Sequence, residues 1–138
     1  MPPIIREREG AGKVIRPATL EDMPEIGKLL VSRGLYDEAP SEISRTTLVS
    51  VKSGQIAGVI QCLLGHPVSV MTDLAVVEGY EHNGIARSLL GAMEDLMRMA
   101  GYRKWAAFTR PDNPRATINL AKYGAKYTGP VRSFSKEL

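Results

Sequence analysis

The sequence is poor in the residues that build disulfides, metal clusters and stacking surfaces. It contains one cysteine, Cys62, and two histidines among 138 residues. A lone cysteine closes no internal disulfide and completes no zinc ligand set, so we expect no metal site. Aromatic residues make up only 6% of the chain, which gives little support to a protein that stacks the bases of a nucleic acid.

Long hydrophobic runs are also missing. The longest strictly apolar runs, Leu74 to Val77 and Trp105 to Phe108, have four residues each, whereas a membrane-spanning helix needs about 20. The first residues, Met1 to Arg6, lack the apolar segment of a secretory signal. We therefore expect a cytoplasmic protein without a membrane partner.

What remains is the composition of an ordinary globular domain, with 43% apolar and 24% charged residues. A domain averages roughly 150 residues, so we expect a single domain over residues 13–138. Residues 1–12 are polar and end in a glycine-rich stretch, which is typical of a loose extension. The fold class expected is α/β, more strictly an α+β mixed sheet.

The net charge of +3 hides an uneven distribution. Residues 1–97 carry 9 basic and 13 acidic side chains, a net of −4, whereas residues 98–138 carry 9 basic and 2 acidic, a net of +7. A basic C-terminal third indicates an anionic ligand or partner, although a solvated basic face has the same composition.

Apolar spacing and turn residues predict the element order β-α-β-β-β-α-β-α-β. Strands are expected at residues 13–16, 46–52, 55–64, 68–77, 104–110 and 132–136. Helices are expected from Asp22 to Gly34, over residues 83–100, and from Pro114 to Gly124. We expect Asp22 to cap the first helix with Glu25 in a capping box, and Glu94 to pair with Arg98 in the second.

The most informative stretch runs from Leu74 to Ser88, where an expected strand turns into the long helix. Gly84 falls at the start of that helix, where backbone amides lack partners and carry partial positive charge. A glycine lets a phosphate approach the backbone, and Arg87 adds a full charge nearby. The same residues also suit a simple tight turn, so both interpretations stay open here.

Five segments in the right order resemble the GCN5-related N-acetyltransferase (GNAT) superfamily, whose members transfer acetyl from acetyl-CoA to an amine. They are Val14–Thr19 with Asp22, Gly54–Gly58, Leu74–Val76, Glu81–Ala86, and Asn113–Ala116 with Lys122–Gly124. The resemblance covers roughly residues 13–137. It implies a GNAT-like acyl-CoA N-acyltransferase fold.

The resemblance also implies a cofactor site for acetyl-CoA (coenzyme A). Backbone groups of Leu74, Ala75 and Val76 would pair with the pantetheine arm, and Asn113 would bond the pantetheine side of the cofactor. The pyrophosphate would lie against His82, Asn83, Gly84, Ile85, Ala86, Arg87 and Ser88. Acetyl would pass directly to the amine, so the protein would mainly position the reactants and polarise the thioester carbonyl.

The sequence departs from the family pattern at three positions. Glu81 stands where the family's pyrophosphate motif begins with Arg or Gln, which places an acid near a diphosphate. Leu120 occupies the position of a tyrosine that serves many members as general acid, and Phe108 that of a glutamate base in some. Tyr123, one helical turn after Leu120, is a candidate replacement acid, and the alternative is a tyrosine that packs the end of a helix.

Asp73 is the candidate general base, because it is the only carboxylate within the expected central strands. An acid in such an apolar stretch should titrate abnormally or carry a partner. A salt bridge or strand-end cap is therefore the alternative role. Cys62 is expected to be a core residue rather than a nucleophile.

Three functions remain open at this point. The first is an acetyl-CoA-dependent N-acetyltransferase acting on a small amine, a peptide N-terminus or a lysine, with acidic Asp37, Glu38 and Glu42 favouring a cationic acceptor. The second is a non-catalytic acyl-CoA-binding or regulatory module, supported by Leu120 and Phe108. The third, a nucleic-acid or ribosome-associated protein, rests only on the basic C-terminal charge, so we expect no nucleic-acid partner. A homodimer is kept open as the assembly.

Overall fold

The computed structural model describes residues 13–40, 44–109, 114–132 and 134–138. The chain divides into two compact units, one up to Ala106 and one from Ala107 onward. Its elements are β1 (Lys13–Pro17), the short 3-10 helix η1 (Leu20–Asp22), α1 (Met23–Ser32), β2 (Thr46–Lys52), β3 (Gln55–Leu63), β4 (Ser69–Val76), α2 (Ile85–Met99), β5 (Trp105–Ala107) and α3 (Pro114–Lys122). The expected α/β class with a mixed sheet is confirmed.

The strands form one sheet in the order β1-β2-β3-β4-β5, with antiparallel pairing from β1 through β4. β3 lies in the middle, and every residue from Ile56 to Cys62 is buried, as its lack of charge predicts. Ser53 and Gly54 join β2 to β3 with φ values of 52° and 78°. Two positive φ angles suit a two-residue hairpin turn that follows the twist of the strands.

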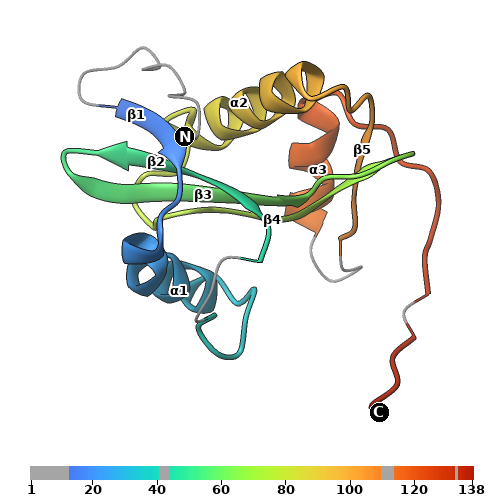
Figure 1. Cartoon of the computed structure of the whole chain (residues 1–138), viewed down its shortest axis with the longest axis horizontal. Helices are drawn as coiled ribbons and strands as arrows, with labels where there is room; N and C mark the ends of the chain where they lie inside the picture. Colours follow the sequence, from blue (N-terminus) through green and yellow to red (C-terminus); the bar gives the residue numbers. More distant parts are fainter. Residues whose placement is uncertain (1–12, 41–43, 110–113, 133) are drawn as a thin grey trace. The chain divides into compact units, whose positions relative to one another are not determined.

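The helices α1 and α2 lie on opposite faces of this sheet (Figure 1). Ile26 and Leu30 of α1 are fully buried in a cluster with Val49 of β2 and Val59 of β3. α2 packs on β2, β3 and β4 through its own buried side chains, which are Ile85, Leu89, Leu90, Ala92, Met93 and Met97. The 3.6-residue spacing of the apolar positions is what directs each helix to one face.

Two predicted contacts of the helices are wrong. Asp22 occupies the N-cap position of α1 as predicted, but its carboxylate turns back to the Thr19 amide (2.7 Å) and to the Arg16 guanidinium (2.7 and 2.9 Å), and makes no capping bond to α1. Glu25 makes no capping box and instead accepts from the Ile56 amide at 3.1 Å. A guanidinium beside Asp22 offers two charge-assisted bonds, which outcompete a single helix amide.

The predicted Glu94–Arg98 pair is also replaced. Arg98 lies 3.1 Å from Asp95, and Glu94 accepts from the indole nitrogen of Trp105 at 2.9 Å. Trp105 is half-buried and its N–H needs an acceptor, so Glu94 is drawn toward β5. Gly101 ends α2 in the left-handed conformation with φ 87°, as expected.

The strand expected at residues 132–136 is absent from the described part of the C-terminal segment. The exposed fractions of Val131 and Phe134 are 70% and 90%, so no apolar face holds this segment to a core. The strand expected at residues 104–110 is shorter, at Trp105–Ala107. No helix among the described residues has the length and apolar character needed to cross a membrane.

Candidate active site

The segment between β4 and α2 makes a tight turn that exposes the start of α2. Tyr80 donates its amide to the Val77 carbonyl at 3.0 Å, and Gly79, His82 and Gly84 have φ values of 95°, 68° and 77°. A left-handed φ is costly for residues with a side chain, which explains the glycines. Beyond Gly84 and its two chain neighbours, no atom of the described residues lies within 4 Å of the position that a Cβ of Gly84 would occupy.

The first hydrogen bond within α2 runs from the Ser88 amide to the Gly84 carbonyl, at 3.0 Å. The amides of Ile85 and Ala86 therefore have no acceptor one turn back in the helix. Ile85 is buried and anchors the helix, whereas His82, Asn83 and Arg87 are exposed around its start. Open space, helix amides and the positive end of the helix dipole together fit a diphosphate group.

β4 presents the backbone groups of Leu74 and Val76 along its edge away from β3, the edge on which β5 is the next strand in sheet order. The Val77 amide donates to the Ala57 carbonyl at 2.9 Å, and Ala75 pairs with Val59. Bonding direction alternates along an antiparallel strand, so the polar groups of Leu74 and Val76 face the other side. Ala75 itself bonds toward β3, so its backbone is not part of that edge. Of the three predicted pantetheine-binding residues, this register favours Leu74 and Val76.

Two basic side chains from other elements hold the turn. Arg33 Nη2, at the end of α1, lies 2.9 Å from Glu81 Oε1, and Lys52 Nζ lies 5.1 Å from the centre of the Tyr80 ring. Glu81 is therefore paired, which accounts for an acid at the start of the pyrophosphate motif. No pattern in the sequence had singled out Arg33 or Lys52.

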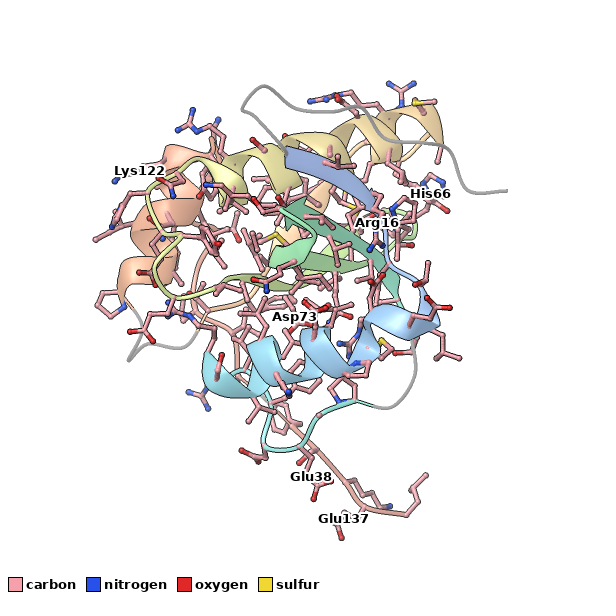
Figure 2. The ribbon with its side chains drawn as sticks, turned by 90° about the vertical axis from the view of Figure 1, so that its left-hand side faces the viewer. Arg16, Glu38, His66, Asp73, Lys122 and Glu137 are labelled. Carbon is pink, nitrogen blue, oxygen red and sulfur yellow. The ribbon has the colours of Figure 1, made fainter. Side chains whose placement is uncertain are left out.

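Asp73 lies in a buried polar network between the sheet and α1 (Figure 2). Its side chain is 7% exposed, and Oδ2 accepts from Gln61 Nε2 (2.8 Å), Tyr36 Oη (3.0 Å) and Arg45 Nη1 (3.1 Å). Arg45 also donates to the Tyr36 hydroxyl. Asp73 thus has the salt bridge that was one of its two expected roles.

All three of these side-chain donors bind the same carboxylate oxygen. Among the described residues none binds Oδ1 of Asp73. On a side chain that is largely buried, a carboxylate oxygen without a donor is unusual, because the loss of its hydration is then uncompensated. Oδ1 is therefore the part of the network that has capacity for a further donor, such as a bound amine.

No direct signal in the sequence pointed to Tyr36, Arg45 or Gln61. Gln61 sits opposite Asp73 in the β3–β4 register, and the register shifts immediately afterwards because β4 is bulged at Thr72. The sequence does show that Asp73 is isolated among apolar residues. This predicts that the carboxylate has a partner, but it does not identify which residue the partner is.

Cys62 is buried in β3, as expected. Burial and the nearby charge of Asp73 raise the pKa of the thiol to about 12. The thiolate is the reactive form of cysteine, so this side chain is chemically inert at neutral pH.

The second unit contains Tyr123 and the residues around α3. The Tyr123 amide closes the last turn of α3 on the carbonyls of Asn119 (3.2 Å) and Leu120 (3.1 Å). Thr109 and Thr117 are joined through their hydroxyls at 3.2 Å, and Phe108 is 66% exposed. Asn113 and Glu42 lie outside the described residues, so the predicted roles of both stay predictions.

Comparison with known proteins agrees with this architecture. The model of the acetyltransferase (GNAT) family matches residues 19–125, which is most of the chain. The protein belongs to this family. The resemblance inferred from the sequence motifs is thereby confirmed.

One curated relative is similar in sequence, and two solved structures are similar in fold at low identity. A beta-lysine N(6)-acetyltransferase of Methanococcus maripaludis is 31% identical over 98 residues, which cover 65% of this chain and 36% of that protein. The chain thus matches about a third of the length of this curated relative. The aminoglycoside N-acetyltransferase AAC(6')-Iy in complex with CoA superposes with a TM-score of 0.78 and 16% identity, covering 94% of this chain and 98% of that one. AAC(6')-Ih from Acinetobacter baumannii gives a TM-score of 0.73 at 17% identity, covering 92% and 99%.

Proposed function

We propose that this protein is an acetyl-CoA-dependent N-acetyltransferase that passes acetyl directly to a primary amine. The observation that carries the proposal is the start of α2. Gly84 holds φ 77° with open space beside it, at the end of the turn from β4 to α2, in a chain that belongs to the GNAT family. This arrangement supplies backbone amides and helix dipole to an anionic group.

The proposed cofactor site combines the start of α2 with the backbone groups of β4 that face away from β3. Amides in the segment from His82 to Arg87 would hold the diphosphate, and Arg87 would add positive charge. The Ser88 amide, which was also expected to take part, is already bonded to the Gly84 carbonyl within α2. The backbone groups of Leu74 and Val76 would bond the amides of the pantetheine arm as an added strand does. When bound, acetyl-CoA supplies the activated acetyl group as a thioester.

We propose Asp73 as the residue that receives the acceptor amine. A protonated amine cannot attack a carbonyl, so the reaction needs a group that binds the ammonium and takes its proton. The Asp73 side chain is 7% exposed; its Oδ1 has no donor among the described residues, while Oδ2 is bonded by three. Tyr123 stays the proposed acid that returns a proton to the departing thiolate.

The acceptor class proposed is a cationic primary amine on a small molecule, a peptide N-terminus or a lysine. Asp37 and Glu38 are exposed on the segment after α1 that carries Tyr36 to Asp73. The names of the relatives fit this class, because beta-lysine and aminoglycosides both carry primary amines.

A thermal-shift titration tests the cofactor and an amine panel tests the chemistry. Acetyl-CoA and CoA at about 100 times Kd should each stabilise the fold by about 2.7 kcal/mol. If neither compound stabilises the fold, both cofactor-based functions are refuted.

The amine panel then follows the release of free thiol with beta-lysine, lysine, aminoglycosides and short peptides. Cofactor binding without thiol release for any amine would favour the non-catalytic module, to which Leu120 points.

Location and assembly stay predictions. We propose a cytoplasmic protein and keep a homodimer open as the assembly. Light scattering on the purified full chain, with and without CoA, tests the dimer. A molar mass near 15.1 kDa under both conditions would exclude it.

A further inference from the structure

The ion pair between Arg33 and Glu81 joins two elements that are far apart in the sequence. Arg33 is fixed at the end of α1, where its amide donates to the Leu29 carbonyl at 3.0 Å. Its guanidinium meets Glu81 at 2.9 Å, and the two side chains are only 34% and 30% exposed. The pair therefore ties α1 to the turn that leads to Gly84.

A second contact holds the same turn from another side. Lys52, at the end of β2, places its ammonium 5.1 Å from the Tyr80 ring centre, which is within range of a cation–π interaction. Tyr80 and Glu81 are adjacent, so neighbouring residues of the turn are held by two different elements. The turn is thus anchored to the scaffold just before the left-handed residues His82 and Gly84.

Charge alone makes Glu81 a poor choice beside a diphosphate. An unpaired carboxylate there would repel the ligand, but the paired carboxylate contributes almost no net charge with Arg33. A carboxylate that only repelled the diphosphate would lower the affinity for CoA. A carboxylate that also fixes the turn can offset that loss, because it keeps the helix amides in place for the ligand. The geometry thus favours a mechanical role.

We infer that Arg33 and Glu81 are positioning residues, which hold the turn in the conformation that presents the start of α2 to the cofactor. This inference rests on the proposed function, because it assumes an anionic cofactor at that site. It extends the function to Arg33, which follows α1 and lies outside the family's pyrophosphate motif. It also predicts that Glu81 strengthens CoA binding, whereas its negative charge alone predicts that it weakens CoA binding.

The sign of the effect at Glu81 separates positioning from charge. If the pair positions the turn, Glu81→Gln and Glu81→Arg both weaken CoA binding, by about two- to fivefold for a half-exposed pair. If Glu81 only repels the diphosphate, both variants bind CoA more tightly. The charge-swapped double variant Arg33→Glu with Glu81→Arg should recover most of the loss, because it restores the pair. Titration calorimetry with CoA measures all of these affinities.

Arg98→Gln is the matched control. It removes the ion pair with Asp95 from the far part of α2, where the partners are 68% and 58% exposed, and should leave CoA affinity unchanged. Unfolding temperatures of all variants show whether a loss of affinity reflects a loss of folding.

Amide hydrogen exchange of the ligand-free protein gives a readout that does not need CoA. Exchange in residues 78–86 should be faster in Glu81→Gln than in the wild type, and unchanged in Arg98→Gln. Wild-type protein that does not bind CoA would refute the proposed function, and the exchange rates would still decide whether the pair holds the turn. Tighter CoA binding by Glu81→Gln, or unchanged exchange, would overturn the inference.

Discussion

A Cβ atom at Gly58 would lie 2.8 Å from Cγ2 of Ile85 and 3.1 Å from the Ala75 carbonyl oxygen. Gly58 is in the centre of β3, and Ile85 is the first residue of α2. The absence of a side chain at this position therefore sets how closely the start of α2 approaches the sheet. It also sets the height of the helix amides above the edge of β4.

Gly58→Ala should push the start of α2 away from the sheet. Overpacking of this kind costs about 1–3 kcal/mol of stability, and the displacement should also weaken CoA binding because the helix amides move. Denaturant unfolding measures the first effect and calorimetric titration the second. Gly65→Ala is the control, since a Cβ there would meet only the Val68 carbonyl oxygen at 3.9 Å. Equal stability of the two variants would show that the Gly58–Ile85 contact is not tight.

Gly84→Glu should abolish CoA binding. The substitution places a side chain and a negative charge at the start of α2, where the diphosphate would lie. The left-handed backbone also costs a residue with a side chain about 1–2 kcal/mol, so a control with equal strain is required. Gly101→Glu supplies it, with φ 87° and equally open space at the other end of α2. CoA binding by a folded Gly84→Glu variant at wild-type affinity would rule out this site.

Much of the scaffold around this site could be predicted from local patterns. The alternation in β2 and β3, the Ser53–Gly54 turn and the apolar stripe of α2 each depend on residues close in sequence. Gly84 was identifiable for the same reason, because the strand, turn and helix that define it are consecutive.

The partners of the charged residues could not be predicted in the same way. Asp73 meets Tyr36, Arg45 and Gln61 only because the sheet register and the bulge at Thr72 bring them to one face. A shift of one residue would turn Asp73 to the other face. Side-chain pairs between distant segments depend on that register, which local spacing does not encode.

Competition between donors explains the local errors as well. Asp22 was expected to cap α1 and bonds Arg16 instead, and Glu94 was expected to pair with Arg98 and bonds Trp105 instead. In each case the pattern correctly marked an acceptor and the fold brought a different donor. The strand expected at residues 132–136 was wrong for a different reason. Its apolar residues are exposed in the described part of that segment, and an apolar pattern alone does not show that a neighbouring strand is there to pair with.

Asp73→Asn should lower turnover far more than cofactor affinity. Loss of a general base typically costs about 10²–10⁴-fold in rate, whereas the CoA site is built from α2 and the β4 backbone. Steady-state kinetics with the best amine of the panel measures kcat, and calorimetry measures the CoA dissociation constant. We expect the latter to stay within about twofold, a change worth less than about 0.5 kcal/mol.

Two further variants separate catalysis from packing at Asp73. Tyr36→Phe removes one donor to Oδ2 and leaves Oδ1 untouched, so it should lower stability slightly and turnover only a few-fold. Arg45→Gln removes the charged partner and tests how much of the Asp73→Asn effect is lost folding stability. If all three variants lose turnover in proportion to their loss of unfolding temperature, Asp73 is a structural residue and not the base.

The Arg16–Asp22 pair makes a specific contribution to the pH dependence of stability. The bonds from Arg16 lower the pKa of the Asp22 carboxyl from its ordinary 3.8 to about 2, and Asp22 raises the pKa of Arg16 in turn. The folded-state pKa of Asp22 is thus below its unfolded value. The stabilisation is therefore complete above about pH 4 and is lost as the pH falls through about 2.

Asp22→Asn isolates this contribution from that of the other carboxylates. One pKa unit corresponds to about 1.4 kcal/mol, but the Arg16 side chain is 37% exposed. Solvent screening therefore reduces the expected gap between wild type and variant to about 1–2 kcal/mol at pH 6. Denaturant unfolding at low salt should show that gap closing between pH 4 and pH 2. A gap of the same size at pH 6 and pH 2 would mean that the Asp22→Asn variant loses packing or hydrogen bonds rather than the charge interaction with Arg16.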